Sequence, residues 1–374
     1  MKQGWEIKKL GEVCEIVGGS TPKTNEPSYW DGEHYWVTPA ELDGAKYISS
    51  TSRTITDEGV KSAHLQLLPS GTVLLSSRAP IGKVAITTTP MYCNQGFKNL
   101  VCSTKLHNEF VYWFLYHRKE YLNSLGTGAT FKEISKRVVE QIPIPVPPRE
   151  EQERIVEILD RKFERIDALK ANAEQNLQHA KDLFQSALKQ ELQPKEGWVT
   201  MKLGAFAHMK AGDFIKASDI KDEYFEGAYP CYGGNGLRGY VKEPNRNGEY
   251  CLIGRQGALC GNIHIANGVF RATEHAVVVS PYQKMPIKLI YYLLVSLNLN
   301  QYSTGAAQPG LSVKNIADNV SISVPPKDIW NSIALRLEII ESNCKALEEN
   351  YKKTIALCDD MKQALLRKAF NGEL

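Results

Sequence analysis

The sequence contains none of the short motifs that mark common catalytic and metal sites. It has no CxxC, GxSxG or HExxH, and its eight histidines do not recur at metal-ligand spacing. Gly82-Lys83 lacks the upstream glycines of a phosphate-binding loop. We therefore expect a chain without catalytic residues or bound metal, which acts as a reader or as a scaffold. A catalytic endonuclease or methyltransferase is disfavoured.

Long hydrophobic runs are also missing. The longest, Leu289 to Leu299, is too short to cross a bilayer, and the segment from Met1 to Trp5 shows no signal-peptide core. The eight cysteines show no paired spacing, and Cys344 and Cys358 fall on a helix seam, where a free thiol packs as a small hydrophobe. These features predict a reducing, cytoplasmic location without disulfides.

A strong net charge is the third absence. The formal charge of the whole chain is only +3. By region it is +2 over residues 1–148, −2 over 149–192, +3 over 193–326 and zero over 327–374. Because the small positive excess lies outside the long helical segments, it favours anionic partners at the globular regions.

One glycine-rich motif matches a dinucleotide-binding pattern without the flanking elements that such a site needs. Gly234 to Gly239 matches GxGxxG, but a dinucleotide site needs a strand before the motif and a helix after it. Pro230 precedes the motif and Pro244 follows it closely, so no helix opens there. We expect a glycine-rich turn instead.

The chain is an internal repeat with a period near 190 residues. Such a period is too long for a solenoid and fits two domains of ordinary size. The repeated landmarks are Gly4-Trp5 with Lys9-Leu10-Gly11 and Gly197-Trp198 with Lys202-Leu203-Gly204, then Val146-Pro147-Pro148 and Val324-Pro325-Pro326, and finally Glu191-Leu192 and Glu373-Leu374.

Each half closes with a double proline and a long segment of helical periodicity. Proline is tolerated at a helix start but breaks a helix interior, so it fixes where each helix begins. Apolar residues recur in alternating steps of four and three, which is typical of a coiled coil. The expected seam is Ile155, Leu159, Ile166, Leu169, Ala173, Ala180, Leu183 and Ala187 in the first segment, and Ile333, Leu337, Ile340, Cys344, Leu347, Tyr351, Cys358, Met361 and Leu365 in the second.

The two globular regions predict a mixture of short strands and one or two helices. In the first, strands are expected near Trp36, over 73–77 and 84–86, with one helix over 109–124. In the second, strands are expected over 250–254 and 261–265, with a helix over 288–299. The predicted fold is α+β: two α/β domains in tandem duplication, at 1–148 and 193–326, each followed by a long helix, at 149–192 and 327–374. The two helices are expected to pair as an antiparallel coiled coil.

Several sequence elements resemble those of the specificity subunits of Type I restriction-modification systems. The resemblance covers the whole chain, and its motifs occur in duplicate. Lys327-Asp328-Ile329-Trp330 departs from the family's Glu-Gln after the second double proline, which puts a contact there in doubt. The matching elements are Pro143 to Pro148 with Glu151-Gln152 and Ile155, Tyr229 to Tyr240, Ile253 to Gly257, Cys260-Gly261-Asn262, and Leu365 to Leu374.

The resemblance implies that each globular region is a target-recognition domain for one half of a split, asymmetric duplex DNA sequence. It implies that the helices separate the domains and dock two modification subunits, which bind S-adenosylmethionine and methylate adenine. Separate restriction subunits, which translocate DNA with ATP and Mg, would cut unmodified DNA. The specificity subunit itself would hold no cofactor and no catalytic residue.

Candidate DNA contacts are polar and basic residues in the loops between strands. Arginine, asparagine and glutamine read base edges, whereas lysine, serine and threonine favour phosphates. Arg78 and Arg255 lie in corresponding loops, so each is expected to act on a different half-site. The full set is Ser77, Arg78, Lys83, Asn94, Gln95, Lys98, Thr127 and Thr130 in the first domain, and Asn235, Arg238, Arg255, Gln256, Asn262, Arg271 and Gln308 in the second. The alternative that stays open is a coiled-coil scaffold for proteins, without DNA binding.

Overall fold

The computed structural model describes residues 4–78, 80–128, 132–257, 259–305 and 310–374. It divides into two compact units, one of Met1–Ala173 with Lys353–Leu374 and the other of Glu174–Lys352. Each long helix therefore contributes residues to both units. The sequence-based boundaries at 148, 192 and 326 mark segments of the chain rather than compact units, and they stay a prediction.

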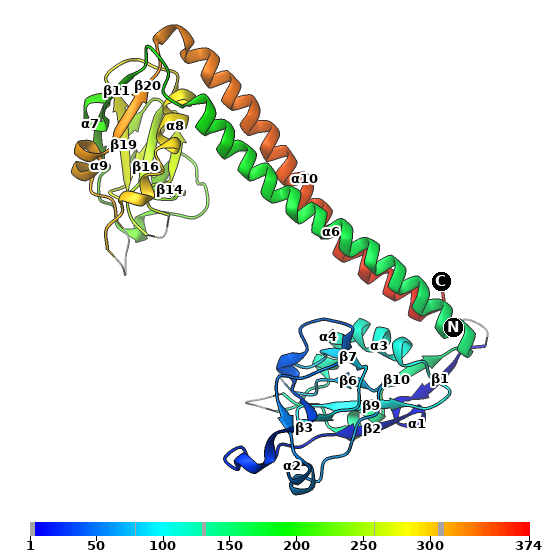
Figure 1. Cartoon of the computed structure of the whole chain (residues 1–374). Coiled ribbons are helices and arrows are strands. Elements are labelled where there is room, and N and C mark those ends of the chain that lie inside the picture. The colour runs from blue at the N-terminus through cyan, green and yellow to red at the C-terminus, as the bar shows by residue number, and fades with distance from the viewer. Residues whose placement is uncertain (1–3, 79, 129–131, 258, 306–309) are drawn as a thin grey trace. The chain divides into compact units, whose positions relative to one another are not determined.

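The first unit contains a five-stranded sheet in the order β2-β9-β6-β7-β4, a three-stranded sheet β5-β3-β8 and the pair β1-β10. Helix α3 lies beside β6 and β7, and the core fills the space between them with buried aromatic and aliphatic side chains (Figure 1). The elements are β1 (Glu6–Lys9), α1 (Leu10–Val13), β2 (Cys14–Gly18), β3 (Trp30–Val37), β4 (Tyr47–Ile48), β5 (Thr54–Ile55), α2 (Asp57–Ser62), β6 (Val73–Leu75), β7 (Val84–Thr87), β8 (Tyr92–Cys93), β9 (Lys98–Cys102), α3 (Asn108–His117), α4 (Lys119–Ser124), α5 (Lys136–Glu140), β10 (Pro143–Val146) and α6 (Arg149–Glu191), with 3-10 turns at Pro27–Tyr29 and Pro39–Glu41.

The second unit repeats this plan with two four-stranded sheets, β12-β19-β16-β17 and β14-β13-β18-β15, and the pair β11-β20. Helix α8 packs on β16 and β17 as α3 packs on its sheet. The elements are β11 (Val199–Lys202), α7 (Leu203–Phe206), β12 (Ala207–Ala211), β13 (Tyr229–Gly233), β14 (Gly236–Val241), β15 (Arg246–Asn247), β16 (Tyr250–Gly254), β17 (Ile263–Ala266), β18 (Val269–Ala272), β19 (Ala276–Pro281), α8 (Ile287–Ser296), α9 (Val313–Asn319), β20 (Ser321–Val324) and α10 (Trp330–Asn371), with 3-10 turns at Ala217–Asp219, Leu299–Tyr302 and Lys327–Ile329.

The duplication extends to single hydrogen bonds. The amide of Leu10 donates to the carbonyl of Ile142 at 2.9 Å, and the amide of Leu203 donates to the carbonyl of Val320 at 2.8 Å. In both units this bond joins the end of the first strand to the residues just before the last strand. The predicted tandem α+β duplication is thus confirmed at the level of backbone pairing.

The structure decides two expectations about secondary structure, the helix over 109–124 and the glycine-rich turn over 234–239. The helix expected over 109–124 is two helices, because Arg118 leaves the helical region (φ −91°, ψ 12°) and ends α3 before α4 begins. The glycines of 234–239 lie in the hairpin that joins the antiparallel strands β13 and β14. The expectation of a turn rather than a dinucleotide loop is confirmed there.

A buried side chain fixes the start of each long helix. Gln152 is fully buried; its amide nitrogen donates to the carbonyls of Pro147 at 2.8 Å and Lys105 at 3.0 Å, and its oxygen accepts from the amide of His107 at 2.8 Å. In the second unit the indole of Trp330, five residues after Pro325, donates to the Pro325 carbonyl at 2.8 Å. The contact put in doubt by the departure at residues 327–330 is therefore kept with a different side chain.

Within each unit the two long helices run antiparallel. In the first unit Arg154 donates to the carbonyl of Leu374 at 2.5 Å, and Lys170 pairs with Asp359 at 2.7 Å, so the residue numbers rise on α6 as they fall on α10. In the second unit Arg336 pairs with Glu191 at 2.8 Å.

The heptad seam is confirmed only in part. Of the expected seam residues, Ile155, Leu159, Ile333 and Leu337 are among those that are buried. Leu159, Ile166, Ala173 and Ala180 stay buried at intervals of seven residues, and Leu337, Cys344 and Cys358 keep the same seven-residue register, so along most of the pair the buried contact follows one position of each heptad rather than two. The expected seam residues that are exposed are Leu169, Leu183, Leu347 and Met361, and Leu188 and Leu366 are buried without having been predicted.

We expect Gln152→Ala to lower the free energy of unfolding by about 2–4 kcal/mol, since it leaves one amide and two carbonyls without their buried partner. Thermal and denaturant unfolding of the full chain would measure this loss. The matched control is Gln178→Ala on the exposed face of α6, where the side chain bonds only Asp182 among the described residues. Its effect should stay within about 0.5 kcal/mol, and equal losses in both variants would contradict the role given to Gln152.

Candidate nucleic-acid interface

The loop between β6 and β7, residues 76–83, is held by main-chain hydrogen bonds to distant segments. The amide of Ser77 donates to the carbonyl of Gly96 at 2.7 Å, and its carbonyl accepts from the amide of Ile134 at 2.9 Å. The amide of Gly82 closes the loop on the carbonyl of Ser76 at 3.0 Å. These bonds fix the backbone and leave the following side chain, that of Arg78, at the surface.

The loop between β16 and β17 is held in the same way. The amide of Arg255 donates to the carbonyl of His275 at 2.9 Å, and its carbonyl accepts from the amide of Leu311 at 2.8 Å. The amide of Gly261 donates to the carbonyl of Gly254 at 2.7 Å. Arg255 therefore occupies the place of Ser77. Arg78 and Arg255 lie in corresponding loops, but one residue apart in register.

The position that corresponds to Arg78 is Gln256. The backbone of Arg78 forms an isolated antiparallel β-bridge with Glu133, as that of Gln256 does with Gly310. Glu133 forms a second such bridge with Thr127, and Gly310 forms one with Thr304. The sequence could not place this register, because it is set by residues about fifty positions downstream. At equivalent surface positions the two domains present an arginine and a glutamine.

Two cations of the first domain meet one carboxylate. The Nε atom of Arg78 donates to Oε2 of Glu133 at 2.9 Å, and Nζ of Lys98 contacts Oε1 at 3.3 Å. Burial acts to raise the pKa of Glu133, but the hydrogen bonds from Arg78 and Lys98 outweigh it and leave that pKa lowered. The Lys98 side chain is only 14% exposed, whereas that of Arg78 is 46% exposed. Arg78 is thus the cation that a large ligand can reach.

The other candidates of the first domain surround this group with different exposures. Ser77 is fully buried, and its hydroxyl receives a contact from Lys98 at 3.4 Å. Lys83 donates to the carbonyl of Pro39 at 3.1 Å, and Thr127 is exposed. We therefore leave Ser77 and Lys98 out of the proposed contacts and keep Lys83 and Thr127.

The neighbouring turn at residues 94–97 carries two more candidates. Asn94 accepts from the amide of Gly96 at 2.9 Å and so shapes the turn. Gln95 is exposed and accepts a hydrogen bond from Thr21. Of the pair, Gln95 is the side chain available to a ligand. Thr130 and, in the second domain, Gln308 lie outside the described residues.

In the second domain three candidates line one hollow of about 420 Å³: Asn235, Arg238 and Gln256. All three are exposed. His275 lines the same hollow, with its Nε2 atom 3.1 Å from Glu274. His275 was not among the candidate contacts, because nothing in its neighbourhood along the chain points to this hollow.

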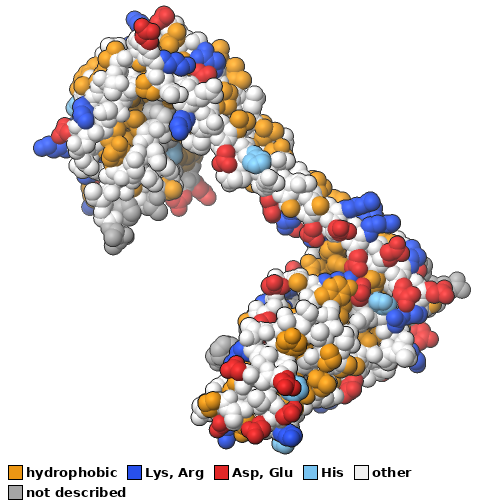
Figure 2. Space-filling view, in the orientation of Figure 1, with side chains coloured by type: hydrophobic (Ala, Val, Ile, Leu, Met, Phe, Trp, Pro, Cys, Tyr) orange, Lys and Arg blue, Asp and Glu red, His pale blue; other side chains and the backbone are white. Residues whose placement is uncertain are grey.

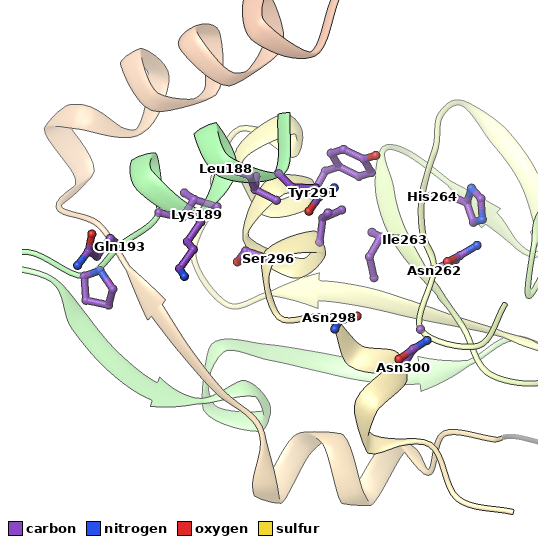
Figure 3. Close-up of a pocket in the computed structure, with 15 residues that line it drawn as sticks. Leu188, Lys189, Gln193, Asn262, Ile263, His264, Tyr291, Ser296, Asn298 and Asn300 are labelled. Atoms are coloured by element: carbon purple, nitrogen blue, oxygen red, sulfur yellow. The ribbon is translucent and has the colours of Figure 1, made fainter. Parts of the chain in front are cut away.

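The remaining candidates of the second domain lie elsewhere. Asn262 lines a cavity of about 1010 Å³, where Lys189 and Gln193 face it from the end of α6 and the following turn (Figure 3). Arg255 is half-buried and donates to the carbonyl of Leu311 at 3.3 Å. Arg271 lines a third cavity, of about 860 Å³, and its guanidinium donates to the backbone carbonyls of Phe214 and Glu243, each at 3.3 Å. The candidates of this domain therefore do not form a single surface.

The described residues offer no metal or membrane site. They contain no group of three or more His, Cys, Asp or Glu side chains placed to hold a metal ion. Among the same residues, no helix is long and apolar enough to cross a membrane. The eight cysteines are free thiols.

Comparisons with known proteins agree with the duplicated architecture. The family model for the Type I restriction modification DNA specificity domain matches residues 2–179 and 195–357. The chain is 33% identical over 364 residues to the Type I restriction enzyme EcoprrI specificity subunit of Escherichia coli, covering 91% of this chain and 88% of that protein. It is 29% identical over 416 residues to the MjaIX specificity subunit of Methanocaldococcus jannaschii, covering 99% and 93%.

Two solved structures share the fold. A chain from a study of complex assembly and conformational transition of the type I R-M system gives a TM-score of 0.81 at 22% identity, covering 100% of this chain and 99% of that one. The HsdS subunit from Thermoanaerobacter tengcongensis gives 0.67 at 22% identity, covering 100% and 98%. The expectation of a specificity subunit rather than a catalytic one agrees with the names of the sequence relatives.

Acidification should destabilise the second domain through His264. A Cβ added at Gly236 would lie 3.2 Å from the His264 ring, so this ring packs under the β13–β14 turn that carries Asn235. Burial lowers the pKa of His264. Below about pH 6.5 the unfolded chain therefore binds a proton at this histidine more readily than the folded domain does. The free energy of unfolding of the domain decreases as the pH falls. The unfolding midpoint should drop between about pH 7.5 and pH 5.5, and it should drop less in His264→Gln. His208→Gln, at an exposed histidine of the same domain, is the control, and an identical drop in both variants would contradict the account.

Proposed function

Because the chain belongs to the family of Type I restriction modification DNA specificity domains, we propose that it reads the two halves of a split duplex target, one half with each domain. The observation that carries this proposal is the shared loop frame. The same main-chain hydrogen bonds hold Ser77 and Arg255, while the next side chain is arginine in one domain and glutamine in the other. A common backbone with different base-reading groups suits two different half-sites.

The chemistry of these two side chains suggests different bases. Arginine forms a bidentate contact with the O6 and N7 atoms of guanine, and glutamine does so with N6 and N7 of adenine. We therefore propose that Arg78 reads a guanine in the first half-site and that Gln256 reads an adenine in the second. The proposed contacts around them are Lys83, Gln95 and Thr127 in the first domain and Asn235, Arg238 and His275 in the second.

The exposed apolar side chains of the long helices suggest where modification subunits dock. Figure 2 shows hydrophobic side chains at the surface of the helices in both units. Large apolar side chains exposed along the long helices fit a surface that a protein partner covers. The exposed residues are Leu169, Leu357 and Met361 in the first unit, and Leu183, Leu335, Ile339 and Leu347 in the second. We propose one modification subunit at each unit.

The cofactors of the system belong to these partners in our proposal. The modification subunits would bind S-adenosylmethionine and methylate adenine, and restriction subunits would bind ATP and Mg. This chain would contribute target reading in the cytoplasm, where the DNA of the host is accessible.

The proposal predicts weak duplex binding by the chain alone and strong binding with the modification subunits, because the positive excess of the globular regions is small. Phosphate contacts should make the affinity fall steeply with salt. Gel-shift titrations at several salt concentrations measure both effects. Partner binding without any DNA binding would support the scaffold alternative instead.

Arg78→Ala and Gln256→Ala should each weaken discrimination at one half-site only, by about 1–3 kcal/mol for the lost bidentate contact. Competition binding of the assembled complex, against duplexes with single base-pair changes in either half-site, measures this. Arg255→Ala should act less specifically, since its guanidinium is half-buried against Leu311. Loss at both half-sites after either of the first two changes would mark a general phosphate contact or a folding residue.

The length of α6 should set the spacing between half-sites. The helix is continuous from Arg149 to Glu191 and contributes to both units. Four residues inserted within 170–180 add about 6 Å of helix, which matches about two base pairs of duplex. Genome-wide mapping of methylated adenines should show unchanged half-sites and a spacer longer by one or two base pairs. Two inserted residues would rotate the seam and abolish activity, and an active four-residue variant with an unchanged spacer would rule this proposal out.

A further inference from the structure

We infer that Glu133 positions the Arg78 guanidinium for its base and so determines how strictly the first domain discriminates. The inference rests on the proposed function, because it assigns Glu133 a role through Arg78. The residue lies outside the loop between β6 and β7. It was not among the candidate contacts, which were chosen for basic, amide and hydroxyl groups.

The carboxylate of Glu133 is held from both sides. Oε2 accepts from Nε of Arg78 at 2.9 Å, and Oε1 faces Nζ of Lys98 at 3.3 Å. Lys98 is mostly buried, so its charge stays at the carboxylate rather than in solvent. The group carries one net positive charge, which remains attractive to DNA.

The backbone of Glu133 is held as well. Its amide and carbonyl exchange hydrogen bonds with Thr127, at 2.9 and 3.0 Å, and the next residue, Ile134, donates to the carbonyl of Ser77. The carboxylate therefore stays beside the loop that carries Arg78. A long surface arginine loses rotamer freedom on binding, and a fixed partner removes part of that loss in advance.

The geometry leaves the reading edge of Arg78 available for a base. The hydrogen bond to Glu133 uses Nε, so the two terminal nitrogens at the tip of the guanidinium are not needed for that contact. The side chain is 46% exposed. Because the guanidinium is planar, fixing Nε also fixes the direction of the fork that meets O6 and N7 of guanine.

The second domain provides an internal comparison. Where the first domain pairs Arg78 with Glu133 in a backbone β-bridge, the second pairs Gln256 with Gly310 in the same way. A neutral amide needs no carboxylate to orient it, and none is supplied at that position. The acid thus occurs together with the arginine.

An opposite role for the same contact is competition. In that case Glu133 would compete with DNA phosphate for Arg78, and removing its charge would tighten binding to every duplex. The second partner, the mostly buried Lys98, and the hydrogen-bonded backbone of Glu133 favour positioning, because both hold the carboxylate in place rather than letting it withdraw.

The test uses the chain assembled with its modification subunits and the duplex target established by methylation mapping. Glu133→Gln should reduce discrimination at the base pair read by Arg78 about tenfold, toward the effect of Arg78→Ala. In the Arg78→Ala background, Glu133→Gln should change discrimination by less than about twofold, since coupled residues are not additive. Discrimination at the second half-site should stay unchanged. The thermal midpoint should fall by only a few degrees, because the lost ion pairs are partly exposed.

Glu140→Gln is the matched control. Its side chain is 35% exposed, as is that of Glu133, and it pairs with Lys136 on α5. It removes the same charge from the same domain and should leave discrimination intact. An equal loss in this variant would reduce the effect to net charge and overturn the inference.

The outcomes separate the inference from the function on which it rests. If Arg78→Ala changes discrimination at no base pair, the proposed reading by Arg78 fails. If Arg78→Ala acts while Glu133→Gln leaves discrimination unchanged, or tightens binding to all duplexes alike, only the positioning role of Glu133 fails.

Discussion

The main-chain hydrogen bonds on either side of Ser77 and Arg255 are the constraint on which the candidate interface depends. Each residue donates to one distant segment and accepts from another, so the backbone just after a central strand is fixed at Ser77 and at Arg255. Buried backbone groups must be paired, and these bonds therefore resist change. The side chains of the next residues, Arg78 and Gln256, are not needed for these main-chain bonds and can differ. This separation explains how one duplicated scaffold presents Arg78 with Glu133 in one domain and Gln256 with Gly310 in the other.

The junction between each domain and its long helix obeys the same logic. The double proline ends the last strand and sets the helix start, and a buried donor five residues later ties the first helical turn back to the proline carbonyl. Gln152 and Trp330 provide that donor with unrelated side chains. The bond is therefore what the two halves share, and the residue type is free to change. Antiparallel helix pairing within each unit then brings the chain terminus, at Leu374, beside the start of α6.

Much of this architecture could be predicted from the sequence, because proline positions, apolar periodicity and internal repeats are local signals. The repeat, the start of α6 at Arg149 and the strands on either side of the recognition loops were predicted in this way. Helix α10 was expected from residue 327, but it begins at Trp330 because a 3-10 turn at Lys327–Ile329 precedes it. The counterpart of Arg78 could not be predicted, because the loop register is set by the segments around Glu133 and Gly310. The burial of Ser77 and Lys98 likewise depends on contacts with distant parts of the chain. The exposure of Leu169 and Leu183 could not be predicted either, because a heptad count does not tell how much of the apolar stripe the partner helix covers, and here Ile166, Ala173 and Ala180 are buried between them.

The central claim is that one backbone frame carries two different readers. Mapping methylated adenines in a host that carries the wild-type chain with its modification subunits tests it most directly. The account predicts a split motif with two unlike halves and an unspecified spacer, with a guanine specified in the half assigned to the first domain and an adenine in the other. A continuous motif, or two identical halves, would contradict it.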